Sequence, residues 1–252
     1  MILRVLLLWL LLAWPAAAAE QVISGLSQNR VAITANFDGS EIVVFAAVAR
    51  TSPPPPGRLD VIVTVEGPTG PVIVRRKARW FGIWVNAEAV EIDAAPVFYA
   101  IATTGHLGDI LSETENLRHR ISIGQAVRAV GAAHQAADSP AFTDALIRLR
   151  RENGLYLVED GGVTLDRDTL IRADVRLPAA LSEGTFRTRV FLLRDGAVVA
   201  TEETAITVQK EGIERFLHRL ALDRPLVYGI LSLTLAILAG WLASAAFTWM
   251  RR

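Results

Sequence analysis

Apolar residues gather in two blocks, one at each end of the chain, and the first block has the pattern of a signal peptide. Within residues 1–19, a short first stretch carries Arg4, Val5 to Trp14 form an uninterrupted apolar run, and the small residues Ala17-Ala18-Ala19 end the segment. A basic start, a short apolar run and an A-x-A cleavage site are typical of a secretory leader, and the run is shorter than the ~20 residues that span a bilayer. We therefore predict cleavage before Glu20 and export of the segment that follows.

The second apolar block, residues 226–250, contains no charged side chain. At about 1.5 Å per residue, a helix of this length crosses a hydrocarbon core of about 30 Å. Tyr228 and Trp249 lie near its two ends, where amphipathic rings settle at membrane interfaces. We predict one transmembrane helix over 226–250 and a cytoplasmic tail over 251–252, with the leader setting the orientation.

Four small residues recur at every fourth position within this predicted helix: Ser232, Ala236, Gly240 and Ser244. Small side chains at this spacing let two helix backbones approach closely. We predict membrane lipid as one partner, and an integral-membrane protein or a second copy of the chain as another, held through this helix. The alternative is an ordinary span that is rich in small residues and has no helical partner.

Between the two blocks, the pattern predicts β structure followed by helices. Residues 20–104 alternate short β-branched and aromatic runs with turn residues such as Asp38-Gly39. Closely spaced short strands predict an immunoglobulin-like β-sandwich over 20–104. Residues 105–154 change to a helical period, with Asp138-Ser139-Pro140 as a helix start and Asn153-Gly154 as a helix end.

Strands return over residues 155–209, where Asp195-Gly196 is the strongest hairpin signal. A second β domain and a sheet that completes the first both fit this pattern. Residues 210–225 have the period of an amphipathic juxtamembrane helix, which we predict lies along the membrane surface; packing on the β domain is the alternative. The predicted fold class is mainly β: immunoglobulin-like sandwich domains, an inserted helical segment and one C-terminal transmembrane helix.

The densest mixture of cationic and aromatic residues covers residues 75–84. In a strand, Arg75, Lys77 and Arg79 face one way. This row of cations predicts contact with an anionic group or with the acidic patch of a partner. The alternative is a charged edge strand that resists aggregation, with its tryptophans in the core.

Composition and missing motifs exclude several classes of function. The formal net charge is zero, which argues against a nucleic-acid binder. The chain has no cysteine, which excludes disulfides, a thiol nucleophile and a zinc knuckle. Its four histidines are scattered, and it has no P-loop, dinucleotide fingerprint or G-x-S-x-G. We predict no catalytic residue, no metal ligand and no cofactor, and leave open a site assembled only in three dimensions.

Several strings in the chain resemble a family of alpha-proteobacterial transmembrane proteins. The matching strings are residues 38–45, 76–77 with 82–86, 96–100, and Lys210-Glu211-Gly212. The likeness covers the whole mature chain, and none of these strings is a known active-site motif. The resemblance implies an accessory component of the bacterial envelope and implies no particular chemistry.

The leading interpretation is a non-enzymatic protein held in the bacterial inner membrane by a single span. Its bulk would lie in the periplasm and its C-terminus in the cytoplasm, and its β domains would bind a transporter or another envelope complex. One alternative is a membrane-bound sensor or binder of a small anionic ligand through the strand at residues 75–79. A further alternative is an anchored hydrolase with a convergent site. A deep polar pocket would favour either alternative, whereas an exposed apolar patch would favour the leading interpretation.

Overall fold

The computed structural model describes residues 20–28, 30–33, 39–50, 53–131, 138–210 and 220–250. The predicted leader, most of the predicted juxtamembrane helix and the predicted tail lie outside these residues. The chain divides into two units: a β unit, which comprises Met1–Val31 and Asp38–Val208, and a second unit, which comprises Ala32–Phe37 and Gln209–Arg252.

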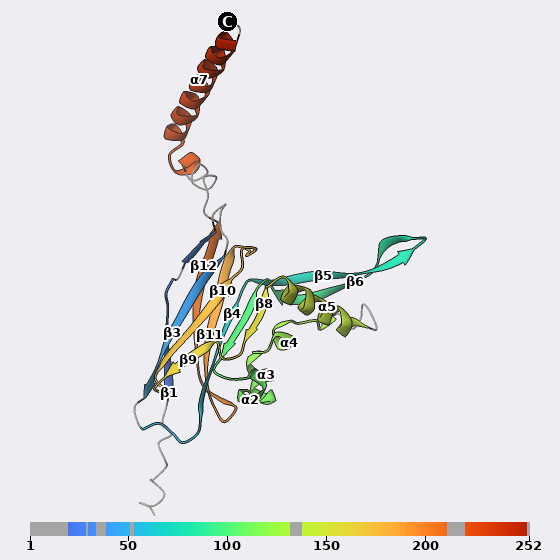
Figure 1. Cartoon of the computed structure of the whole chain (residues 1–252), viewed down its shortest axis with the longest axis vertical. Coiled ribbons are helices and arrows are strands. Elements are labelled where there is room, and N and C mark those ends of the chain that lie inside the picture. Colours follow the sequence, from blue (N-terminus) through green and yellow to red (C-terminus); the bar gives the residue numbers. More distant parts are fainter. Residues whose placement is uncertain are drawn as a thin grey trace, which may run out of the picture. The chain divides into compact units, whose positions relative to one another are not determined.

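Runs rich in β-branched residues form the strands of the β unit, because such side chains pack well on a pleated surface. In chain order, the described strands are β1 (Glu20–Leu26), β2 (Arg30–Ile33), β3 (Ser40–Arg50), β4 (Leu59–Glu66), β5 (Thr69–Trp80), β6 (Ile83–Pro96), β7 (Tyr99–Thr103), β8 (Tyr156–Glu159), β9 (Val163–Asp166), β10 (Leu170–Leu177), β11 (Gly184–Arg194) and β12 (Ala197–Lys210). They form a four-stranded sheet in the order β1-β3-β10-β9, a six-stranded sheet in the order β2-β12-β11-β4-β7-β8, and a separate two-stranded ribbon, β5-β6 (Figure 1).

Each of the two sheets combines strands from before and after the helical segment. In the four-stranded sheet β3 pairs with β10, and in the six-stranded sheet β4 pairs with β11, both in antiparallel register. The helical segment connects β7 to β8, and these two strands pair in parallel, as a crossover connection requires. The fold is therefore mainly β as predicted, while its relation to the immunoglobulin fold stays a prediction.

The central strand β4 shows how the layers of the β unit are arranged. Residues 59–65 are all buried, on both faces of the strand. Ile62 belongs to a core cluster with Ile121, Ile123 and Leu146 of the helical segment, so that segment covers one face of the six-stranded sheet. On the other side, β10 and β9 of the four-stranded sheet contact β4. The six-stranded sheet is thus the middle layer, which explains the apolar run in β4.

The helical segment is broken into short helices. Its described members are α2 (Leu107–Ile110), α3 (Glu113–His119), α4 (Ile123–Ala126) and α5 (Ser139–Glu152). The helical period of residues 107–121 predicts one continuous helical face, but only α2 and α3 cover this stretch. Leu111 and Ile121 lie outside both helices, and Leu117 of α3 is exposed.

The helical spacing predicts an apolar stripe of Phe142, Leu146 and Leu149 in α5. Phe142 and Leu146 are buried as predicted, whereas Leu149 is exposed. Asp138 precedes α5, but its side chain does not cap the helix.

A buried ion cluster links the two sheets through the start of β1. The carboxylate of Glu20 accepts hydrogen bonds from Arg194 of β11 at 2.8 and 2.9 Å and from Arg50 of β3 at 2.7 Å. The pKa of Glu20 is lowered to about 2, mainly by the hydrogen bonds from Arg194. The hydrogen bond from Arg50 lowers the pKa further, whereas burial acts to raise it. An ionised carboxylate between two arginines from different sheets stabilises their packing.

The predicted hairpin at Asp195-Gly196 is confirmed. β11 and β12 pair in antiparallel register on either side of it. Asp195 and Gly196 have φ angles of +50° and +81°, which are the left-handed values that a two-residue hairpin turn demands. Aspartate and glycine adopt these φ angles at low energetic cost, and so the turn can be predicted from the sequence.

The second unit contains the long helix α7 (Pro225–Met250). It begins one residue before the predicted span and ends where predicted. Residues 225–243 are long and apolar enough to cross a membrane, and the rest of the described chain buries none of them. Ser232, Ala236, Gly240 and Ser244 all lie within α7, and their role in helix packing stays a prediction. An uncovered apolar helix is stable in lipid and unfavourable in water.

Candidate functional site

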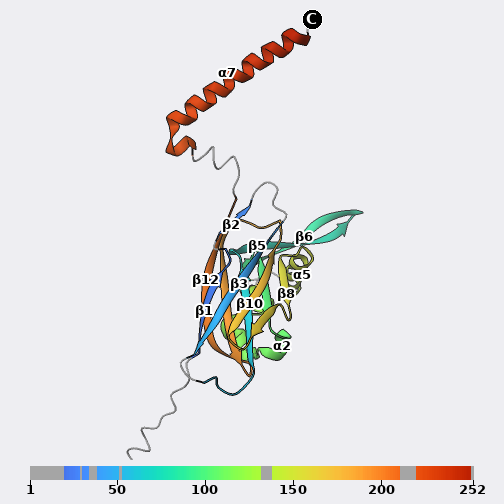
Figure 2. The ribbon, with the colours of Figure 1, turned by 60° about the vertical axis from the view of Figure 1, so that its left-hand side comes forward.

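The ribbon β5–β6 is a long hairpin that extends beyond the two sheets (Figures 1 and 2). Its strands pair from Thr69↔Pro96 at the base to Trp80↔Ile83 at the end, with irregularities in register after Gly70 and after Arg76. Neither strand pairs with a strand of the two sheets. An isolated two-stranded ribbon is at best marginally stable in water, so packing at its base must hold it.

Apolar contacts with α5 fix the base of the hairpin. Val90 of β6 is fully buried against Phe142 of α5, and Val74 of β5 packs on the same cluster. The guanidinium of Arg76 lies 4.8 Å from the centre of the Phe142 ring. The face of the ribbon that carries Val74 and Arg76 therefore looks toward α5.

Arg76 also ties the ribbon to the start of α5 electrostatically. Its guanidinium donates to Glu88 on the paired strand and, over 2.9 Å, to Asp138. These bonds, led by the one to Glu88, raise the pKa of Arg76. Asp138, which the sequence predicts as a helix cap, is instead an ion-pair partner of Arg76.

The outer end of the hairpin, residues 78–85, is called the hairpin tip below, and it exposes four large apolar side chains. The exposed fractions are 65% for Trp80, 95% for Phe81, 65% for Ile83 and 68% for Trp84. The expectation that the tryptophans of this segment lie in the core is therefore wrong. Large exposed apolar residues gathered in one place mark interaction surfaces in soluble domains.

The turn of the hairpin tip is strained. Phe81 and Gly82 have φ angles of +47° and +87°, the same left-handed pair found at Asp195-Gly196. Glycine adopts this conformation freely, but a bulky aromatic residue does so at a cost of about 1–2 kcal/mol. The Phe81 ring stacks on Trp80, with 6.1 Å between ring centres, and is otherwise presented outward. Strain of this kind concentrates at functional sites.

The predicted row of cations lies on the face of the ribbon opposite to α5 and reaches the hairpin tip at Arg79. Arg75, Lys77 and Arg79 alternate with Val74 and Arg76 along β5, so they face away from α5. All three are exposed, and none forms an ion pair within the described part of the chain. The structure therefore groups the three predicted contact residues on one open face, and their binding role stays a prediction.

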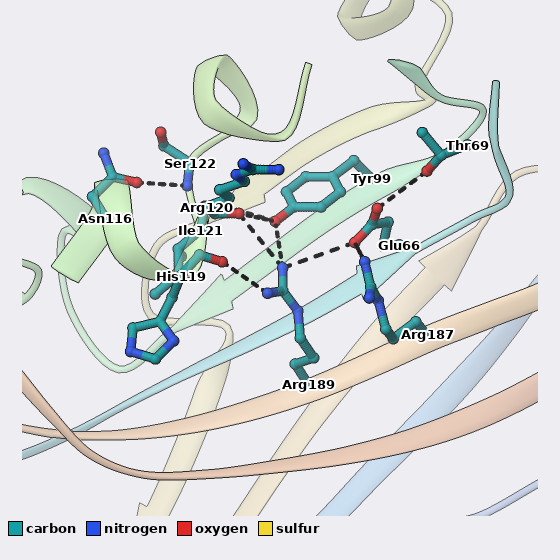
Figure 3. Close-up of polar contacts among 10 residues, drawn as sticks. All are labelled: Glu66, Thr69, Tyr99, Asn116, His119, Arg120, Ile121, Ser122, Arg187 and Arg189. Carbon is teal, nitrogen blue, oxygen red and sulfur yellow. Dashed lines mark hydrogen bonds and ion pairs between the residues drawn. The ribbon is translucent and has the colours of Figure 1, made fainter. Parts of the chain in front are cut away.

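A closed polar network secures the root of the hairpin (Figure 3). Glu66, at the end of β4, accepts hydrogen bonds from Thr69 of β5 and Arg187 of β11. Arg189 of β11 donates to the carbonyl oxygen of His119 over 2.8 Å. Tyr99 of β7, fully buried, donates to the carbonyl oxygen of Ile121 over 2.8 Å.

Burial raises the pKa of Tyr99 to about 12, so its hydroxyl stays protonated and continues to donate. The network joins β4, β5, β7 and β11 to the loop that follows α3. Because its central hydroxyl is sealed from solvent, the network is a structural clamp and not a ligand site. The residues of this network lie far apart in the sequence, and no local sequence pattern predicts their contacts.

A shallow open pocket beside β8 contains the nearest approach to catalytic chemistry in the described residues. His106 Nδ1 lies 2.6 Å from Asp160 Oδ2, and the backbone N–H of Leu107 donates to Asp160 Oδ1. The hydrogen bond between the two side chains raises the pKa of His106 and lowers that of Asp160. The pocket is lined by His106, Leu107, Gly108, Arg151, Tyr156, Leu157, Val158 and Asp160.

This pocket lacks the parts that an acyl-transfer site requires. Its lining residues include no serine, threonine or cysteine that His106 could activate. The hydroxyl of Tyr156 donates to the carbonyl oxygen of Pro96, and burial raises its pKa to about 12. Among the described residues there is also no cluster of three metal-binding side chains.

Comparisons with known proteins concern the chain as a whole. Residues 21–249 match the family described as "Putative transmembrane protein (Alph_Pro_TM)". No curated protein gives a significant match. A solved structure, the sporulation control protein Spo0M from Bacillus subtilis, is similar with a TM-score of 0.26 and 9% sequence identity. The alignment covers 77% of this chain and 50% of that one, so the chain spans half the length of that protein.

The likeness to Spo0M is too low to support an argument about fold or function. The family match, by contrast, runs from the second residue of β1 almost to the end of α7. It therefore includes both the hairpin and the long apolar helix. The chain belongs to this family of transmembrane proteins.

Proposed function

We propose that the protein is a non-enzymatic accessory component of the bacterial envelope, which touches another envelope component through the hairpin tip. The observation that carries the proposal is the exposure of Trp80, Phe81, Ile83 and Trp84 on a hairpin held out from the sheets. In this account α7 spans the inner membrane once, the β unit lies in the periplasm and residues 251–252 lie in the cytoplasm.

The strain at Phe81 supports a contact role for the tip. A left-handed phenylalanine that is almost fully exposed stabilises neither its own turn nor the core. Asparagine or aspartate would form the same turn with less strain. A contact with a molecule outside the chain would bury the Phe81 ring, which the folded protein by itself leaves exposed.

The two alternative functions have weaker geometric support. Arg75, Lys77 and Arg79 attract anions, but they lie on an open ribbon face and so cannot enclose a small ligand as binding sites usually do. The pair of His106 and Asp160 lacks a nucleophile in its pocket. A contact surface fits the hairpin better than either.

The proposal is tested by measuring how accessible the tip is in its native membrane. The chain has no cysteine, so Ala78→Cys places a single thiol in the tip, and Ala205→Cys places one on an exposed position of β12 as the matched control. Each variant is treated with a water-soluble maleimide, in open membrane fragments and after purification in detergent.

We expect the tip thiol to react at least about tenfold more slowly in membrane fragments than in detergent, as for a contact occupied about nine-tenths of the time. The control thiol should react at the same rate in both. Equal rates for the tip thiol in the two preparations would refute a contact at the tip.

A further inference from the structure

We propose that the component contacted by the hairpin tip is the headgroup region of an anionic phospholipid bilayer. This inference rests on the proposed function and names the partner. A bilayer contact at the tip would be a second membrane contact of the protein, in addition to α7. It would give a role to both the aromatic and the cationic side chains within residues 75–84.

The order of side chains along the hairpin matches the depth profile of a membrane interface. Phe81 occupies the apex, and Trp80 and Trp84 follow within three residues on the two strands. Indole rings favour the boundary between headgroups and acyl chains, where one edge is apolar and the N–H remains wet. Phenylalanine at the apex would enter deepest and the tryptophans would lie just above it.

The cations stand where phosphate groups would meet them. Arg79, Lys77 and Arg75 succeed one another away from the apex along β5. Each basic residue near an anionic membrane surface strengthens binding by roughly fivefold. The carboxylate of Glu88 is bonded to Arg76, and none of the three cations forms an ion pair within the described residues. Glu91, the other acidic residue near the row, lies further from the apex, opposite Ile73.

A bilayer suits a convex tip better than a protein groove does. A stable protein interface buries about 800 Å² on each partner with close shape complementarity, whereas a lipid surface adapts to the side chains that enter it. The same chain carries a helix fit to span a membrane. A bilayer is therefore always present at high effective concentration, and even a weak tip contact would be occupied.

The test repeats the thiol measurement with lipid as the sole possible partner. The full chain carrying Ala78→Cys is reconstituted into two kinds of vesicle. One consists of phosphatidylcholine alone, and in the other about one-third of the lipid is phosphatidylglycerol. The rate of the tip thiol is divided by the rate of Ala205→Cys in the same vesicles. Both thiols lie in the β unit, so this ratio cancels the orientation of the protein.

We expect the ratio to fall about tenfold when phosphatidylglycerol is present, and to return to its detergent value in the variant Trp80→Ser/Phe81→Ser/Trp84→Ser. These side chains are exposed, so the variant keeps the core, which an unchanged circular dichroism spectrum verifies. A second variant, Arg75→Gln/Lys77→Gln/Arg79→Gln, should lose the dependence on phosphatidylglycerol.

Three results would overturn parts of the account, and each points to a different part. A tip thiol protected in native membrane fragments but reactive in anionic vesicles would refute the lipid partner, keep the proposed function and indicate a protein partner. Equal protection with and without phosphatidylglycerol would refute the role of the cations. A tip thiol that is reactive in native fragments would refute the proposed function itself.

Discussion

The substitution Phe81→Asn separates the stability of the hairpin from its function, because we expect it to improve one and impair the other. Phe81 holds a φ angle of +47° next to Gly82 at +87°. Asn-Gly is the preferred pair for such a turn, whereas a bulky residue in the left-handed region costs about 1–2 kcal/mol. The ring is 95% exposed and contacts Trp80, so its removal takes little from the core.

The turn should therefore become more stable by about 1 kcal/mol, roughly a fivefold change in the local opening equilibrium. Local opening is measured by hydrogen exchange of the peptides that cover residues 76–88 in the detergent-purified chain. We expect their exchange to slow about fivefold in Phe81→Asn. Asp195→Asn is the matched control, because the turn at Asp195-Gly196 has the same geometry and already holds a favourable residue.

The same substitution should weaken the contact of the tip. Full burial of a phenylalanine side chain contributes about 1.5–3 kcal/mol, so its loss should reduce the binding constant by roughly 10- to 100-fold. Protection of the Ala78→Cys thiol in membrane fragments should then fall from about tenfold to about twofold or less. Faster hydrogen exchange in Phe81→Asn would contradict the assignment of strain, and undiminished protection would contradict the assignment of the contact.

Three further predictions concern the core and the helix. Glu20→Gln should lower the free energy of unfolding by about 3 kcal/mol at neutral pH. The wild-type contribution of Glu20 to the free energy of unfolding is complete above pH 4.5 and is lost as the pH falls to about 2. Denaturant titrations should show this decline in the wild type and in the exposed control Glu41→Gln. They should not show it in Glu20→Gln. Tyr99→Phe should cost about 1–2 kcal/mol through the lost hydrogen bond to Ile121. Since burial raises the pKa of Tyr99 from 10 to about 12, wild-type stability should fall between these pH values, and an equally steep fall in Tyr99→Phe would refute this origin. Gly240→Leu should abolish crosslinked or co-purified partners of α7, because a side chain there meets only open space within the chain; unchanged association would remove the helix-packing prediction.

Features with a local chemical cause could be predicted from the sequence. The long apolar helix needs only an uncharged run of sufficient length, and α7 begins one residue from its predicted start. The turn at Asp195-Gly196 uses residues that favour left-handed φ angles, so its hairpin was predicted at the correct place. The burial of Phe142 and Leu146 in α5 follows from their helical spacing.

The hairpin tip was missed because its turn breaks the rule that reveals turns. A phenylalanine stands where asparagine or aspartate is expected, so local turn chemistry does not mark this turn in the sequence. Burial of Trp80 and Trp84 was then the ordinary expectation for aromatic residues in strands. The mixture of cations and aromatics in residues 75–84 was the one signal that marked the segment as unusual.

Contacts between distant segments could not be predicted from local patterns. Glu20 bonds to Arg194, and the network around Tyr99 joins strands that lie on both sides of the helical segment. Strand pairing depends on which apolar faces meet in three dimensions, and periodicity gives the face of a strand without giving its neighbour. The composition of the two sheets is therefore a result of the structure.

The central claim is that α7 crosses a membrane and holds the β unit on its outer side. It is tested most directly by labelling single cysteines in intact spheroplasts with a membrane-impermeant maleimide. The account predicts that Ala205→Cys reacts from outside, and that Arg252→Cys reacts only after the membrane is permeabilised. Reaction of Arg252→Cys in intact spheroplasts, or protection of Ala205→Cys, would contradict it.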